Sequence, residues 1–206
     1  MTAVVDYGMG NLRSLYNALR YIGVEAEVTS SAGDIEKADR IVLPGVGAFG
    51  DAMEAIREHG LDEALRREAL EKGKPMLGIC LGMQLLAKSS DEHGFHEGLG
   101  WLDAEVVRFD GDAGVKIPHI GWNDIDYEEA EPFFAGLKKS ERAFYFVHSH
   151  HMKCRDRALV LATCRYGAEF AAAVRKENIV AVQFHPEKSQ DNGIQFLQNF
   201  FRWKPL

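Results

Sequence analysis

Short apolar runs, each bounded by glycine, proline or charged residues, recur along the chain. Runs of this length that stay apolar throughout are typical of strands buried on both faces of a sheet. We therefore expect buried strands at residues 3–5, 40–44, 75–79, 144–147, 159–163 and 179–184.

Helical spacing of apolar residues marks the stretches between several of these runs. The pattern covers 11–22 and 51–72, with shorter stretches at 83–88 and 191–203. Strands and helices therefore alternate in the first half of the chain, as in βαβ crossovers, which place parallel strands in the middle and helices on both faces. We expect an α/β fold built on a central, mostly parallel sheet.

The second half, from about Trp101 to Ala173, is richer in strand patterns and poorer in helical ones. This change predicts an antiparallel extension of the sheet. No internal repeat, low-complexity segment or linker divides the chain, and 206 residues suffice for one sizeable core. We expect a single domain spanning 1–206.

The composition, 46% hydrophobic and 27% charged, is that of an ordinary globular protein. The net charge of −7 without a basic tract argues against a nucleic-acid partner, because phosphates require clustered Lys and Arg. The first residues match neither a membrane span nor a signal peptide, so we expect no membrane association and a cytoplasmic protein. Three cysteines without a CxxC pair favour reduced thiols over a disulfide framework or a zinc site.

One cysteine stands at a predicted strand-to-helix corner. Cys80 closes an apolar run and has Gly78 and Gly82 two residues away on either side. This spacing is typical of a cramped turn that holds a nucleophile at the carboxyl end of a strand, near a helix N-terminus that favours a thiolate. The alternative is an inert cysteine buried in a tight connection. Cys154 and Cys164 have no such setting, and we interpret them as packing residues.

A base and its orienting group are predicted near the C-terminus, where an apolar run leads into His185, Pro186 and Glu187. Pro186 holds His185 in extended backbone, where side chains two residues apart project to the same side. A carboxylate that accepts the proton of one imidazole nitrogen fixes the tautomer of the ring. The other nitrogen is then free to take the thiol proton. Parallel strands end along one edge of a sheet, so we expect this turn to meet Cys80 there. The alternative is a solvated surface turn.

The other histidines give no metal pattern. His148, His150 and His151 lie close together, but no carboxylate or cysteine completes a ligand set. We interpret them as solvated or substrate-facing loop residues, and we assign no chemistry to His119. We expect no bound metal and no cofactor.

Together these residues resemble the class I, triad-type glutamine amidotransferases, whose marks are the Cys80 turn and the His-Pro-Glu segment. The resemblance covers nearly the whole chain and implies their flavodoxin-like α/β fold. Further segments resemble one branch of that family, the glutaminase subunits of imidazole glycerol phosphate synthase: DYGMGN (6–11), LPGVGAF (43–49), LGICLGMQLL (77–86), IPHIGWN (117–123), YFVHS (145–149) and QFHPEKS (183–189).

The resemblance implies hydrolysis of the glutamine side-chain amide through a γ-glutamyl thioester on Cys80, with His185 as base and Glu187 as its orienting group. Ammonia would then pass to a (β/α)8-barrel cyclase that forms a heterodimer with this chain. The cyclase would use it to make imidazole glycerol phosphate and an aminoimidazole carboxamide ribotide, in histidine biosynthesis.

The resemblance also implies substrate contacts. Gln84, one helical turn after the nucleophile, and Ser149 would contact glutamine. Gly45 and Gly47 make a flip of the peptide bonds in their loop sterically easy, so that its N–H groups can turn toward the oxyanion. The backbone amides that would face the oxyanion belong to Leu81, Gly45, Val46 and Gly47. Position 150 is a departure, because His150 stands where relatives usually carry tyrosine.

A further set of residues would face the barrel partner. They are Tyr7, Asn11, Trp122, Asn123, Tyr145 and Lys188. Trp and Tyr are enriched at interface hot spots, and a core position is the alternative for Trp122.

Three other functions share parts of this pattern. The first is the glutaminase of another amidotransferase, such as those that feed anthranilate, guanine nucleotide or carbamoyl phosphate synthesis; the DYGMGN and PHIGWN segments argue against it. The second is a cysteine hydrolase that acts alone on peptides or γ-glutamyl conjugates. Activity that depends on a barrel partner would exclude this alternative. The third is a non-catalytic interaction module, and the intact Cys80, His185 and Glu187 argue against it.

Overall fold

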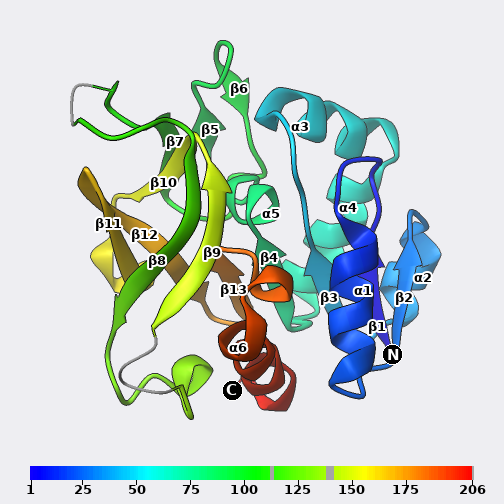
Figure 1. The fold of residues 1–206 in the computed structure, drawn as a ribbon. Helices are drawn as coiled ribbons and strands as arrows, with labels where there is room; N and C mark the ends of the chain where they lie inside the picture. The colour runs from blue at the N-terminus through cyan, green and yellow to red at the C-terminus, as the bar shows by residue number, and fades with distance from the viewer. Residues whose placement is uncertain (112–113, 138–141, 206) are drawn as a thin grey trace.

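The central feature of the structure is a long mixed sheet (Figure 1). The computed structural model describes residues 1–111, 114–137 and 142–205. Within these residues, nine strands form the sheet, in the spatial order β2 (Ala26–Thr29), β1 (Thr2–Val5), β3 (Arg40–Leu43), β4 (Met76–Ile79), β13 (Ile179–Val182), β12 (Ala168–Lys176), β11 (Val160–Tyr166), β8 (His119–Tyr127) and β9 (Ala143–His148). The neighbours β4 and β13 bring distant parts of the chain together in the middle of the sheet.

The sheet has a parallel half and an antiparallel half. β1 pairs in parallel with β2 and β3, and β4 pairs in parallel with β3 and β13. From β13 through β12, β11, β8 and β9, the described pairings are antiparallel. This arrangement confirms the predicted α/β class, with a parallel centre and an antiparallel extension.

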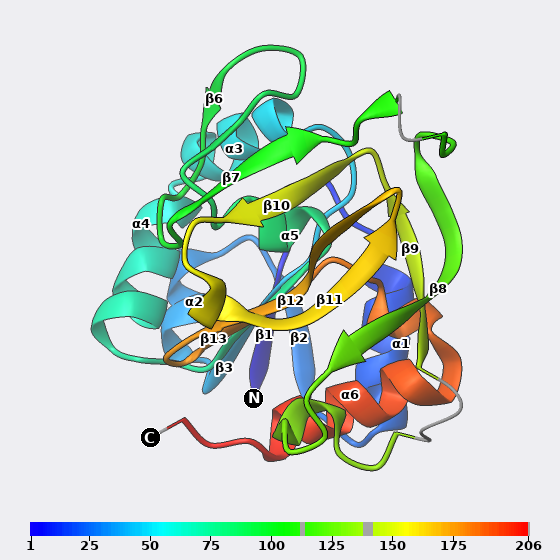
Figure 2. The same ribbon diagram turned by 90° about the vertical axis from the view of Figure 1, so that its left-hand side faces the viewer.

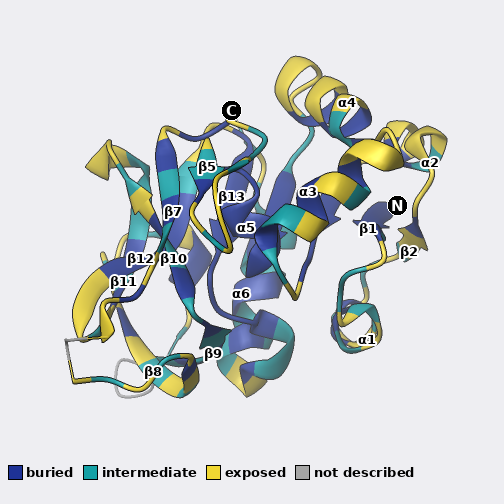
Figure 3. Ribbon diagram, turned by 90° about the horizontal axis from the view of Figure 1, so that it is seen from above, coloured by how far each residue is buried: buried dark blue, intermediate teal, exposed yellow. Residues whose placement is uncertain are grey.

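Helices cover both faces of the parallel half. They are α1 (Leu12–Tyr21), α2 (Ala32–Lys37), α3 (Phe49–Glu58), α4 (Leu61–Leu65), the π-helical turn η1 (Arg66–Glu71), α5 (Leu81–Gln84) and α6 (Gln190–Arg202). Along β1, Ala3 and Val5 belong to a core with α2, α3 and α4, while Val4 belongs to a core with α1 and α6. Figure 2 shows these two groups of helices on opposite sides of the strands. Buried residues accordingly concentrate on the strands and the inward helix faces (Figure 3).

A second, smaller sheet carries one wall of the site. Its described strands are ordered β10 (His150–Cys154), β7 (Ala104–Arg108), β5 (Ser89–Ser90) and β6 (His96–Glu97). β9 ends at His148 and β10 begins at His150, so the chain crosses from one sheet to the other at Ser149. The crossing contacts α5, because Gln84 Nε2 donates to the His150 carbonyl oxygen at 2.9 Å.

The predicted strands are present, with ends that differ by up to a few residues. The single helix predicted at 51–72 is wrong, because Gly60, with a φ of 63°, separates α3 from α4. The helix predicted at 83–88 is also misplaced, since α5 ends at Gln84. Strands such as β2 and β12 lack a long run of large apolar residues, so the sequence pattern does not predict them. None of the described helices is long and apolar enough to cross a membrane.

A buried ion-pair cluster anchors the segment that leads into β4. The Glu68 carboxylate on η1 is 0% exposed and lies 2.9 Å from Lys72 Nζ and 2.7 Å from Lys74 Nζ. Arg67 Nε approaches the same carboxylate at 3.1 Å. Burial raises the pKa of Glu68, but these cations outweigh it and lower the pKa to about 2. Asn178 Nδ2 donates to the Lys74 carbonyl oxygen at 2.6 Å, so the loop before β4 is held from both sides.

Replacing Glu68 with Gln removes the buried counter-charge of these cations, and we expect the free energy of unfolding at neutral pH to fall by roughly 2–3 kcal/mol. The folded-state pKa of Glu68 lies below its unfolded value. Its stabilisation is therefore present above the ordinary value of 4.5 and is lost as the pH falls toward about 2. Denaturant unfolding of the wild type and the variant across this pH range measures both effects.

The control is Glu71→Gln, because Glu71 pairs with Arg66 on the surface, where both side chains are about half exposed. An exposed ion pair contributes at most about 1 kcal/mol to the free energy of unfolding. Equal losses for the two variants would contradict the role of the buried cluster.

Candidate active site

Cys80 occupies a strained turn between β4 and α5. β4 ends at Ile79 and α5 begins at Leu81, so one residue makes the whole connection. The φ of 54° and ψ of −109° at Cys80 lie where residues with a β-carbon are rarely found. The residue is also almost fully buried. The strained turn predicted from the sequence is present.

Close backbone packing explains the two glycines around Cys80. A β-carbon on Gly82 would overlap the carbonyl oxygen of Leu43 at the end of β3. A β-carbon on Gly78 would lie 2.9 Å from the carbonyl oxygen of Gly82. A larger residue at either position would push α5 away from the sheet and release the turn.

His185 follows β13 in extended backbone, with a φ of −98° and a ψ of 98°, before the 3-10 turn η5 (Pro186–Lys188). Val182 in β13 lies opposite Ile79 in β4, so the two strands end level and both turns leave the same edge of the sheet. His185 Nδ1 lies 2.8 Å from Glu187 Oε1, and both side chains are almost fully buried. The contact predicted between these two side chains is therefore present.

The antiparallel half of the sheet holds the histidine turn through main-chain atoms. His185 N donates to the Tyr145 carbonyl oxygen in β9 at 2.9 Å, and Tyr145 N donates to Ser189 Oγ at 3.0 Å. The Ser189 hydroxyl in turn donates to the His185 carbonyl oxygen at 2.6 Å. The position of the imidazole is thus set by a strand rather than by a free loop.

The surroundings of His185 favour an imidazolium. Glu187 Oε1 accepts the Nδ1 proton, which leaves Nε2 for proton exchange with another group. Nε2 is buried and has no hydrogen-bond partner among the described residues. Burial lowers the pKa of His185, but the neighbouring Cys80 sulfur and the Glu187 carboxylate raise it to about 10. The site can therefore pair an imidazolium with a thiolate.

A cavity of about 300 Å³ opens beside Cys80, at the small end of the range of small-molecule sites. Its wall is formed by Val46, Gly47, Cys80, Leu81, Gln84, Glu92, Val147, His148, Ser149, His150 and Lys188. His185 and Glu187 line a smaller pocket together with Gly45. Val46 borders both pockets, so the loop after β3 lies between the cavity and the imidazole.

Tyr7 supports the loop 45–47 from below. A β-carbon on Gly45 would lie 2.9 Å from Leu81 Cβ, so the loop packs directly on the start of α5. Gly47 has a φ of 114°, which favours glycine. The Tyr7 hydroxyl donates to the Pro44 carbonyl oxygen at 2.8 Å, and only 2% of Tyr7 is exposed. Burial and the neighbouring Cys80 raise the pKa of Tyr7 well above its usual range, so the hydroxyl keeps its proton.

Glutamine side chains connect α5 to the cysteine in a buried polar network. Gln84 Nε2 donates to the His150 carbonyl oxygen at 2.9 Å and to Gln183 Oε1 at 3.0 Å. Gln183 Nε2 donates to Cys80 Sγ across 3.7 Å. Gln183 follows β13 and is 0% exposed. The sequence gives only a weak signal for it, a polar residue near the end of an apolar run.

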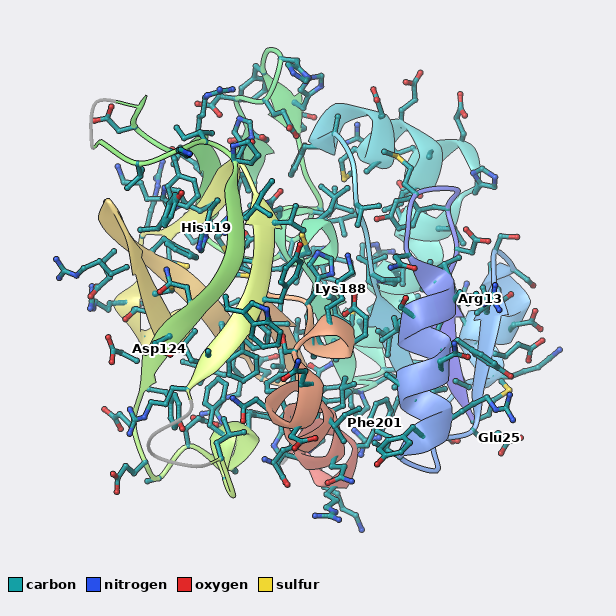
Figure 4. The ribbon with its side chains drawn as sticks, in the orientation of Figure 1. Arg13, Glu25, His119, Asp124, Lys188 and Phe201 are labelled. Carbon is teal, nitrogen blue, oxygen red and sulfur yellow. The ribbon has the colours of Figure 1, made fainter. Side chains whose placement is uncertain are left out.

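Two histidines extend this network from the cavity wall at His148 to His119 on β8. His119 Nδ1 lies 3.0 Å from His148 Nε2, and His148 Nδ1 lies 2.8 Å from the His150 carbonyl oxygen. Asn123 Nδ2 lies 3.4 Å from His119 Nε2. Burial lowers the pKa of His148 to about 3 and that of His119 to about 4, so both rings are neutral at physiological pH. Figure 4 labels His119 on β8.

The sequence pattern predicts that the clustered histidines are solvated or substrate-facing loop residues; the solvated loop alternative is wrong, whereas His148 and His150 do border the cavity. His148 ends a strand and is buried, and His151 is half-buried within β10. His150 is also buried and borders the cavity, with Nδ1 3.4 Å from Glu92 Oε1 and Nε2 3.8 Å from Asp91 Oδ1. Among the residues that the structure describes, no group of three or more His, Cys, Asp or Glu side chains is arranged to hold a metal ion.

Most of the residues expected at a partner interface reach the surface near η5 and β8. Trp122 is 48% exposed, which rules out the alternative that it is a core residue, and Ile120 beside it is 60% exposed. The Trp122 and Tyr145 rings meet edge to face, 6.1 Å apart, and Lys188 Nζ lies 5.7 Å from the Tyr145 ring centre. Asn11 is exposed, and Figure 4 shows Lys188 on the turn above α6. Tyr7 is the exception, because it is buried.

Solved structures share this fold. PurLQS from Thermotoga maritima superposes with a TM-score of 0.74 at 23% sequence identity, over 98% of this chain and 97% of that one. The crystal structure of a glutamine amidotransferase gives a TM-score of 0.70 at 24% identity, over 97% of this chain and 98% of that one.

Other relatives share a larger fraction of identical residues with this chain than these two structures do. Imidazole glycerol phosphate synthase subunit HisH 2 of Nitrobacter winogradskyi is 50% identical, with 98% of each chain covered. Subunit HisH of Rhodopirellula baltica is 49% identical over 97% of this chain and 96% of that one. The family model described as glutamine amidotransferase class-I matches residues 3–203. The chain belongs to the class-I glutamine amidotransferase family.

Proposed function

We propose that the chain is the glutaminase subunit of an imidazole glycerol phosphate synthase. It hydrolyses the side-chain amide of glutamine to glutamate and ammonia, with Cys80 as nucleophile. The observation that carries this proposal is the strained Cys80 at the edge of the sheet, beside a buried imidazole that Glu187 holds at 2.8 Å. The names of the two bacterial relatives support the assignment to histidine biosynthesis.

The reaction begins with attack of the Cys80 thiolate on the side-chain carbonyl carbon of glutamine. The carbonyl oxygen becomes an oxyanion, which backbone N–H groups of Leu81 and of the loop 45–47 stabilise. His185 gives its Nε2 proton to the amide nitrogen, so the C–N bond breaks and ammonia leaves a γ-glutamyl thioester on the sulfur. Glu187 stabilises the imidazolium at the start of this step.

Water completes the cycle. The neutral His185 Nε2 takes a proton from the water as its oxygen attacks the thioester carbon. Collapse of the second tetrahedral intermediate breaks the C–S bond and releases the γ-carboxylic acid, which loses its proton to solvent to give glutamate, while sulfur recovers its negative charge beside the imidazolium. The enzyme is then in its starting state, and no redox change has taken place.

Polar groups around the cavity suit an amino-acid substrate. Both N–H groups of Gln84 are used within the protein, by the His150 carbonyl oxygen and by Gln183, so Oε1 is the Gln84 atom offered to a ligand N–H. Ser149, at the crossing between β9 and β10, adds a hydroxyl, and Lys188 adds a positive charge. Together these groups match the ammonium, carboxylate and amide of glutamine.

The partner in this proposal is a (β/α)8-barrel cyclase that receives the ammonia in a cytoplasmic heterodimer. Its docking surface is the patch formed by Asn11, Trp122, Asn123, Tyr145 and Lys188. Partly exposed aromatic rings and a cation beside the cavity are typical of interface anchors. Tyr7 acts from beneath this surface, by supporting the loop 45–47.

Glutamate release from glutamine tests the proposed activity directly. We expect the purified chain to be stimulated by a cyclase barrel together with its nucleotide substrate. Cys80→Ala should lower the rate by about 10⁴-fold or to background under both conditions, as removal of a nucleophile does in hydrolases. The control Cys154→Ala alters a half-buried cysteine away from the cavity and should retain most of the activity. Activity that ignores the barrel would indicate a stand-alone hydrolase, and inactivity throughout would overturn the proposal.

Replacing Glu187 with Gln tests the role of the carboxylate. We expect the turnover rate to fall by roughly 10²–10⁴-fold, because the imidazolium loses its counter-charge and the tautomer is no longer fixed. The carboxylate raises the pKa of His185, so the substitution should lower that pKa. NMR titration of the imidazole in a Cys80→Ser background measures this change. The matched control is Glu169→Gln, which removes only an exposed pair with Arg157, and an unchanged His185 titration in Glu187→Gln would argue against the assignment.

A further inference from the structure

We propose that Gln183 is a positioning residue for Cys80, and that it holds an amide N–H on the sulfur so that the thiolate is favoured over the thiol. This inference rests on the proposed role of Cys80 as nucleophile. It adds a residue outside the cysteine, histidine and carboxylate set, from a position that does not border the cavity.

The orientation of the Gln183 amide follows from its neighbours. The carbonyl oxygen of His150 can only accept hydrogen bonds, so Gln84 must present its nitrogen to it, at 2.9 Å. The same Gln84 nitrogen lies 3.0 Å from Gln183, where only an oxygen can accept its second proton. Gln183 therefore turns Oε1 toward Gln84 and Nε2 toward the sulfur. The reverse orientation would set two buried N–H groups against each other, with both left unpaired.

Two neutral histidines keep the His150 carbonyl oxygen, the acceptor for Gln84, in place. The His150 carbonyl oxygen also accepts from His148 Nδ1 at 2.8 Å, which leaves His148 Nε2 to accept from His119 Nδ1 at 3.0 Å. This chain requires both rings in one neutral tautomer. Burial lowers their pKa values to about 3 and about 4, so the arrangement persists at neutral pH.

The sulfur lies between a donor and an acceptor. The thiol S–H can donate to the Val147 carbonyl oxygen at 4.0 Å, and this contact is lost when the proton leaves. The N–H of Gln183, at 3.7 Å, gains strength when sulfur becomes negative, since hydrogen bonds to a charged acceptor are the stronger ones. Gln183 is 0% exposed, so water cannot replace its N–H. The bond therefore favours the charged nucleophile and fixes the direction of its sulfur.

Gln183 carries no titratable group, so Gln183→Met leaves the number of charged side chains around the sulfur unchanged. His185 and Tyr7 interact with Cys80 electrostatically. Glu187 acts through its contact with His185, and His119 through its contact with His148. The titratable groups that share the cavity wall with the cysteine are Glu92, His148, His150 and Lys188. Gln183→Met removes both the N–H on the sulfur and the acceptor for Gln84, and of these two contacts only the N–H touches the sulfur.

Alkylation of Cys80 by iodoacetamide measures the thiolate without any glutamine present. Peptide mass mapping separates Cys80 from Cys154 and Cys164, whose pKa values are raised by burial to about 11 and about 12. In Gln183→Met, which keeps the side-chain length but cannot donate, we expect the midpoint of the rate–pH profile to rise by about one unit, a tenfold change in the thiol–thiolate ratio. Gln183→Glu should raise it further, because the sulfur then faces a carboxylate.

The matched control is Gln195→Met on α6, where a half-buried glutamine donates to Asn199 Oδ1 at 2.9 Å, and its profile should equal that of the wild type. Unchanged midpoints in folded Gln183→Met and Gln183→Glu would overturn the inference. A shifted midpoint in a protein without glutaminase activity would instead reject the proposed function and keep the role of Gln183.

A measurement on the unsubstituted side chain covers the case in which the Gln183 variants fail to fold. The side-chain amide ¹⁵N–¹H resonances of Gln183 should shift with pH as the sulfur ionises, and the shift should be absent in Cys80→Ala. Resonances that are independent of pH in the wild type, or that titrate equally in both proteins, would overturn the inference.

Discussion

The site depends on one steric constraint, the contact between the backbone of α5 and the end of β3. Gly82 packs directly on the Leu43 carbonyl oxygen, and the loop that follows β3 packs on Leu81 through Gly45. With α5 held so close to the sheet, a single residue must turn the chain from β4 into the helix. Cys80 therefore takes a φ of 54°, a cost that the surrounding packing offsets. The close packing that Gly78 and Gly82 allow imposes this strain on Cys80. A larger residue at either position would move α5 away from the sheet and relax the backbone of Cys80.

The two halves of the sheet have different tasks in building the site. The parallel half brings Cys80 and His185 to the same edge, because β4 and β13 are paired in register and end together. The antiparallel half fixes their surroundings. Tyr145 in β9 holds the histidine turn through its own N–H and carbonyl oxygen, while its ring faces the exposed patch near Trp122. One residue thus belongs both to the surface proposed for the partner and to the support of the imidazole.

Sequence patterns could predict the features that depend on neighbouring residues in the chain. The Cys80 turn follows from glycine spacing, the His185–Glu187 contact from extended backbone around a proline, and the parallel centre from apolar runs. The burial of Tyr7 and His148 could not be predicted, because a polar or aromatic residue in a glycine-rich loop or at a strand end looks exposed until its tertiary neighbours are known. The same holds for Gln183, whose partners lie on α5 and at the Cys80 turn, about a hundred residues away in the sequence.

Stability does not account for the buried glutamine pair. A hydrogen bond between two buried amides contributes only about 1 kcal/mol net, and replacing both partners with apolar groups of the same shape is often nearly neutral. Such a replacement would also relieve the requirement that the His150 carbonyl oxygen, Gln84 and Gln183 all keep one orientation. What an apolar pair cannot supply is a fixed dipole beside the sulfur. In a water-excluded site a dipole that is already oriented stabilises charge without reorganisation at the moment of reaction. The polar network is therefore better explained by the chemistry of the neighbouring cysteine than by the folding of the chain.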